Sequence, residues 1–132
     1  MSNAPVIGAP LPHITVDCSA GLTDVFDSWS FLRELHPLVI EMSHSQGVCK
    51  TFFRVCAETV VAGLAVADAG LVHVEIGLLP GREDGVKARL SEAVLALLEK
   101  HLHTGHLGRP VRSVEVRDLG ASYRLTGQVP AP

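Results

Sequence analysis

Apolar and polar residues alternate near the start of the patterned part of the chain. Ile14, Val16 and Cys18 fall on one side of an extended segment, and His13, Thr15 and Asp17 fall on the other. This alternation predicts a half-buried strand over residues 13–18. A three- and four-residue spacing follows, at Val25, Trp29, Leu32, Leu35, Val39 and Met42, and predicts a helix that starts at Thr23 and Asp24. Pro37 should kink or divide this helix near His36, and Gly47 should end it.

Two strands, a helix and a final strand follow this first strand and helix. Residues 49–61 are rich in β-branched and aromatic side chains, which favours a strand, and Leu71–Leu79 supplies another before Pro80-Gly81. The acidic stretch 83–85 introduces a helix with apolar residues from Val86 to Leu102, which Gly105 should end. Residues 112–118 alternate again, with Val114 and Val116 facing inward, and residues 123–128 are expected to add a short edge strand.

The resulting order β-α-β-β-α-β predicts an α/β (α+β) domain with a four-stranded sheet and two helices on one of its faces. Residues 12–127 form this single domain, residues 1–11 are an N-terminal extension and residues 128–132 an irregular tail. Outward-facing positions of the sheet are expected to be apolar enough to favour oligomerisation.

Composition removes several classes of function. The chain has 132 residues, 47% of them hydrophobic, and its formal net charge is -3. Disorder is excluded by the apolar content, and a membrane span by the short apolar runs. Nucleic acid is an unexpected partner because the basic residues form no run. The three cysteines have no metal-type spacing and no secretory signal precedes them, which indicates reduced thiols in the cytoplasm.

Two local features carry candidate chemistry. His101, His103 and His106 gather near a helix end, where a metal site competes with a favourable interaction with the helix dipole, and no metal or cofactor is expected. Arg82 follows the Pro80-Gly81 turn beside a helix start, where a guanidinium can bind a carboxylate or simply pair with Glu83 or Asp84.

Three blocks of sequence resemble the 5-carboxymethyl-2-hydroxymuconate isomerase family. They are Pro12-His13-Ile14-Thr15-Val16-Asp17-Cys18-Ser19, Leu71-Val72-His73-Val74 continuing to Leu79-Pro80-Gly81-Arg82, and the helix that leads to His101-Leu102. The similarity spans residue 12 to about residue 127 and places the chain with the tautomerase superfamily, whose β-α-β units assemble as trimers.

The resemblance, together with the local strand pattern, gives candidate roles to five residues. Family enzymes use an amino-terminal proline as the catalytic amine in the breakdown of aromatic compounds, so Pro12 would move the proton of a small acidic substrate and Arg82 would bind its carboxylate or oxyanion. The family's second arginine has no clear match, and Lys50 or Arg54 is expected to replace it. His73 lies on the opposite side of its strand from Val72 and Val74 and is either a structural histidine or a proton-transfer group, so we include it among the substrate-binding candidates.

The position of Pro12 separates the functional hypotheses. Its nitrogen follows Leu11 in a peptide bond and therefore has no basic lone pair. One hypothesis is that translation starts at the Leu11 codon and exposes Pro12, with residues 1–11 a tag or a misassigned start. The alternatives are a non-catalytic trimer that binds a small acid and, more distantly, a metal-binding module built on the three clustered histidines.

Overall fold

Two strand-helix-strand units make up most of the described chain. The computed structural model describes residues 12–47, 49–61, 64–65, 70–103 and 110–127. The first unit consists of β1 (His13–Ser19), α1 (Ser28–Ser43) and β2 (Lys50–Cys56), and the second of β5 (Leu71–Leu78), α2 (Asp84–His101) and β6 (Val111–Asp118). A short 3-10 helix, η1 (Ala20–Leu22), follows β1, and a separate two-stranded sheet pairs β3 (Val60–Val61) with β4 (Leu64–Ala65).

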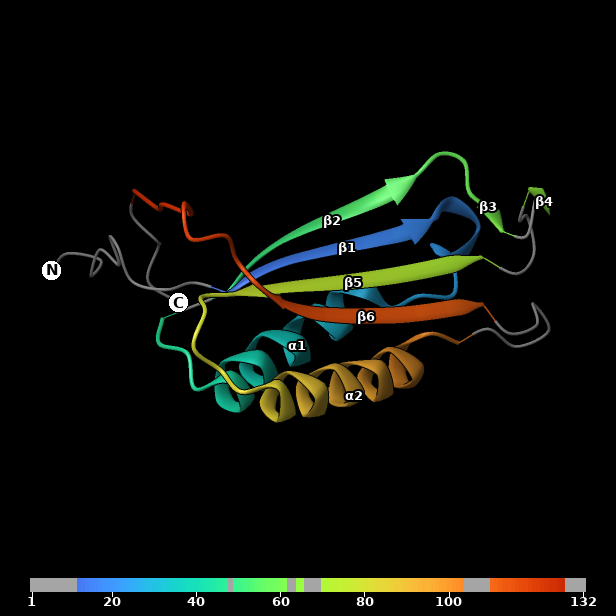
Figure 1. The fold of residues 1–132 in the computed structure, drawn as a ribbon. Coiled ribbons are helices and arrows are strands. Elements are labelled where there is room, and N and C mark those ends of the chain that lie inside the picture. Colours follow the sequence, from blue (N-terminus) through green and yellow to red (C-terminus); the bar gives the residue numbers. More distant parts are fainter. Residues whose placement is uncertain (1–11, 48, 62–63, 66–69, 104–109, 128–132) are drawn as a thin grey trace, which may run out of the picture.

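The four long strands form one mixed sheet in the order β2-β1-β5-β6. Pairing is parallel within each unit, between β1 and β2 and between β5 and β6, and antiparallel where β1 meets β5 at the centre. Both helices lie against the same face of the sheet (Figure 1). The predicted fold class, element order and single-sided helix layer are confirmed.

The core lies between the sheet and the helices. β1 and β5 contribute Ile14, Val16, Val72, Val74 and Ile76, all with no solvent exposure. From α1 come Phe31, Leu35 and Val39, and from α2 come Leu90, Val94 and Leu98, again fully buried. The buried residues of each helix recur every four positions, the spacing that keeps side chains on one helix face.

The opposite face of the sheet is mostly polar, so the expectation of apolar outer positions holds only in part. The register places on this face His13, Thr15 and Asp17 of β1, Lys50, Phe52 and Arg54 of β2, Leu71, His73 and Glu75 of β5, and Val111, Ser113, Glu115 and Arg117 of β6. Its large apolar side chains are Phe52 and Val111, which are exposed, and Leu71, which is partly buried. We call this surface the outer face.

The first helix differs from its prediction at both ends. It begins at Ser28, where the Asp27 side chain accepts a hydrogen bond from the Ser30 N–H, whereas residues 23–25 form a turn. It ends at Ser43, because His44 adopts a left-handed conformation with φ 53°. Pro37 lies inside the helix and does not divide it. Capping geometry, which the apolar spacing does not encode, therefore sets both boundaries.

Other boundaries also moved. The strand expected over residues 49–61 is shorter, since β2 ends at Cys56 and Val60 begins the small separate sheet. Residues 123–127 form no strand, and residue 128 lies outside the described residues. The second helix ends at His101, and Gly105 is also outside the described residues. No helix in the described part of the chain has the length and apolar character needed to cross a membrane.

Candidate functional site

Pro12 lies at the end of the sheet where β1 and β2 begin and β5 finishes. The residue is buried, and its carbonyl oxygen accepts a hydrogen bond of 3.1 Å from the Lys50 N–H. The next residue, His13, pairs with Lys50 on one side and Gly77 on the other. The first residues of both parallel strands therefore meet beside Pro12, in an area that we call the Pro12 end.

His13 lies near two basic side chains, Lys50 and Arg117, and one acidic side chain, Glu75. Burial lowers the pKa of its imidazole below 6.5, the positive charge of Lys50 lowers that pKa further, and Arg117 has the same effect, while Glu75 opposes them. The Phe52 ring lies beside the imidazole, with 5.6 Å between ring centroids. Burial is therefore the main reason that the imidazole disfavours protonation, and the nearby Lys50 charge adds to it.

Lys50 has a neutral partner from a distant part of the chain. Its Nζ donates a hydrogen bond of 2.5 Å to the Tyr123 hydroxyl and lies 5.0 Å from the centre of that ring. Among the described residues, Lys50 forms no ion pair with a carboxylate. Tyr123 was not expected at the site, since 73 residues separate it from Lys50 and no local pattern reports such a contact.

Arg82 lies at the same end of the sheet, in the helix layer. It follows β5, and its guanidinium donates to the Ser43 carbonyl (2.9 Å), the Leu79 carbonyl (3.0 Å) and the Ser45 hydroxyl (3.1 Å). These contacts hold the C-terminal end of α1, and no ion pair joins Arg82 to Glu83 or Asp84. A guanidinium has five N–H donors, so two remain for another acceptor.

Arg54 and His73 lie farther along the outer face. Both are register partners of Asp17, four residues after His13, which corresponds to about 13 Å along an extended strand. Arg54 donates two hydrogen bonds to the Asp17 carboxylate, at 2.8 and 3.1 Å, and His73 Nδ1 lies 2.6 Å from the Ser113 hydroxyl. The structure thus brings Lys50 to Pro12 and leaves these two residues in separate pairs.

One group near His73 has the composition of a metal site. A ring nitrogen of His73 and carboxylate oxygens of Glu75 and Glu115 lie within 4.8 Å of one another, although Arg117 already donates to Glu75 at 3.1 Å. The three histidines singled out by sequence can be compared with this group only in part. His101 is buried against the Glu34 carboxylate, and residue 106 lies outside the described residues.

Comparison with known proteins places this arrangement in a known fold. No family profile and no curated protein sequence matches the chain. Among solved structures, a 5-carboxymethyl-2-hydroxymuconate isomerase from Deinococcus radiodurans R1 is similar, with a TM-score of 0.74, 18% identity, and coverage of 92% of this chain and 94% of the isomerase.

Two further similar structures show how widely the fold is used. A fused 4-OT symmetric trimer has a TM-score of 0.64 and 19% identity, with 82% of this chain and 87% of the other covered. A member of the cis-3-chloroacrylic acid dehalogenase family has a TM-score of 0.63 and 16% identity, with 91% and 85% covered. At these identities the likeness concerns the backbone, and the chain has the tautomerase fold.

Proposed function

We propose that the protein is a tautomerase-type isomerase that moves a proton within an unsaturated acidic substrate bound at the Pro12 end. The observation that carries the proposal is the Lys50 ammonium, which faces outward beside Pro12 and His13 without a carboxylate partner among the described residues. A substrate carboxylate would supply the missing negative charge. The similar isomerase suggests 5-carboxymethyl-2-hydroxymuconate, an intermediate in the breakdown of aromatic compounds, as the first substrate to try.

The proton transfer requires a basic nitrogen at Pro12. An α-amino group titrates near pH 8 in its ordinary state, and neighbouring cations lower that pKa towards neutrality. Such an amine can take the proton from an enol oxygen and return it to carbon. Lys50, and Arg82 through its two remaining donors, would stabilise the carboxylate or the developing oxyanion. This chemistry belongs to a chain whose first residue is Pro12, because an amide nitrogen is not basic.

Assembly and location follow from the same proposal. We place the active protein in a homotrimer, by analogy with the symmetric trimer of similar fold. We place it in the cytoplasm, since Cys18, Cys49 and Cys56 are all free thiols. Neither statement requires a metal or a cofactor at the Pro12 end.

A second candidate function is non-catalytic binding of a small acid at the same end. The peptide bond between Leu11 and Pro12 and the burial of Pro12 favour it, since both remove the proton carrier and leave the positive charges in place. The two functions share a ligand class and differ only in turnover.

The test compares three chains that differ at their first residue: the full chain, one released by a protease to begin at Leu11, and one released to begin at Pro12. Enol-to-keto conversion of 5-carboxymethyl-2-hydroxymuconate is followed by ultraviolet absorbance. We expect the Pro12 chain to be at least about 100-fold faster than the Leu11 chain, the scale of general acid–base catalysis. Calorimetric binding of the substrate without turnover in any chain would establish the second function. Absence of both binding and turnover would contradict both.

A further inference from the structure

Trp29 is a large apolar side chain that the fold does not bury. The helical spacing predicted that it would face the core, but the buried line of α1 runs through Phe31, Leu35 and Val39. Trp29 lies beside that line and is 68% exposed. Burying so large an apolar ring would stabilise the protein, so its exposure singles out this side of α1. Trp29 is also the sole tryptophan of the chain.

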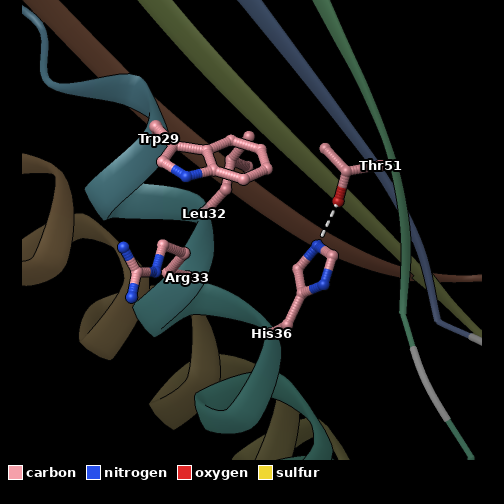
Figure 2. Close-up of a pocket in the computed structure, with 5 residues that line it drawn as sticks. All are labelled: Trp29, Leu32, Arg33, His36 and Thr51. Atoms are coloured by element: carbon pink, nitrogen blue, oxygen red, sulfur yellow. Dashed lines mark hydrogen bonds between the residues drawn. The ribbon is translucent and has the colours of Figure 1, made fainter. Parts of the chain in front are cut away.

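The exposed indole borders a pocket between α1 and β2. The pocket has a volume of about 410 Å³ and is lined by Trp29, Leu32, Arg33, His36 and Thr51 (Figure 2). Four of these residues come from α1 at positions i, i+3, i+4 and i+7, which places them along one side of the helix. This volume lies within the range of small-molecule sites.

The inner end of the pocket is polar and neutral. His36 Nε2 and the Thr51 hydroxyl are 2.6 Å apart, and this contact joins α1 to β2. Burial lowers the pKa of His36, which keeps the imidazole uncharged near neutral pH. A neutral imidazole and a hydroxyl can each donate a hydrogen bond to a polar substituent of a ligand or accept one from it.

The positive charge at the pocket is Arg33. Figure 2 shows its guanidinium below the Trp29 indole and turned away from His36. Its sequence neighbour Glu34 does not neutralise it, because the Glu34 carboxylate is held by Lys100 at 2.7 Å and by His101. Within the described residues Arg33 forms no ion pair.

We propose that this pocket binds a small planar aromatic carboxylate, with its ring on Trp29 and Leu32 and its carboxylate on Arg33. Aromatic stacking and a guanidinium–carboxylate pair are the two interactions that the lining offers, and no other described residue makes either of them with Trp29 or Arg33. The site is separate from the Pro12 end: Lys50 and Thr51 are adjacent in β2 and point to opposite faces of the sheet.

Fluorescence of the full chain tests the proposal directly, since all tryptophan emission comes from Trp29. The titrant is benzoate at constant ionic strength, and benzamide is the uncharged control of the same shape. We expect a saturable change in emission with a Kd of about 1 mM, typical of so small a ligand. Benzamide should bind at least fivefold more weakly.

Two variants separate the proposed contact from general effects. Arg33→Gln should weaken benzoate at least fivefold and remove the difference between benzoate and benzamide. Arg89→Gln, at an exposed arginine of α2, should titrate like the parent protein. The proposal is overturned if benzoate gives no saturable change, if benzamide binds equally well, or if Arg33→Gln has no effect. Blue-shifted emission that does not respond to benzoate would also overturn it, since Trp29 would then be covered in solution.

Discussion

Lys50 and Arg54 are two basic residues on the outer face of the same strand, one near each end, and they differ in what neutralises them. Arg54 makes two hydrogen bonds with the Asp17 carboxylate. Lys50 contacts the uncharged Tyr123 hydroxyl. A paired charge has little left to offer an incoming anion, whereas a charge with a neutral partner retains most of its field. The position of the carboxylate on β1 therefore decides which end of the sheet is suited to bind an acid.

Removing the two charges one at a time should give the largest measurable difference between Lys50 and Arg54. In the chain that begins at Pro12, Lys50→Gln should raise KM for the acidic substrate about tenfold, the value of one charge-assisted hydrogen bond. Arg54→Gln should change KM less than about twofold, because the exposed Arg54–Asp17 pair contributes little. Steady-state kinetics with thermal unfolding as a folding control measures both. Equal effects of the two variants would remove Lys50 from the site.

Arg82 should respond to substitution in a different way from Lys50. Arg82→Gln leaves the Ser43 and Leu79 carbonyls and the Ser45 hydroxyl without their donor, which costs about 1–3 kcal/mol of unfolding free energy. For a domain of this size the Tm should fall by roughly 3–12 °C. Lys100→Gln, which removes an exposed pair with Glu34, is the matched control and should lower Tm far less. An unchanged Tm for Arg82→Gln would contradict its role at the end of α1.

The smallest expected effect is on the pH dependence of stability. The pKa of His13 is lowered in the folded chain, so the unfolded chain binds more protons as pH falls through 6.5, and stability decreases. His13→Asn should reduce this loss between pH 6.5 and 5, measured by urea unfolding. His36→Asn is a useful comparison because burial alone lowers the pKa of His36. If His13→Asn leaves the pH slope unchanged, the lowered pKa assigned to His13 is incorrect.

The sheet and helices were predictable because they depend on local periodicity. Ile14, Val16 and Cys18 alternate and are all buried, and Val114 and Val116 pack against the core as expected. Trp29 was misplaced because its spacing fits two neighbouring helix stripes, and only the packing of both helices selects the one through Phe31. The sequence therefore predicts which side chains point toward the core where burial alone decides their orientation.

The candidate site was predictable only in part. Sequence placed Pro12, Lys50 and Arg82 on separate segments, and the register brings these segments to one end of the sheet. Two of the three acceptors of Arg82, on Ser43 and Ser45, are 39 and 37 positions away in sequence, and the third, Leu79, is local. Lys50 and Tyr123 are 73 positions apart. Pairings at such separations depend on loop paths, which carry no periodic signal in the sequence.

The most direct measurement is a titration of the isotope-labelled full chain with a non-reactive dicarboxylate such as succinate, followed through backbone amide resonances. Saturable shifts at His13, Lys50 and Tyr123, with Asp17, Arg54 and His73 unaffected, are the expected result. They would locate the acid at the Pro12 end whether or not the chain is catalytically active. Shifts confined to the Asp17–Arg54 region, or no saturable shifts anywhere, would contradict the proposed site.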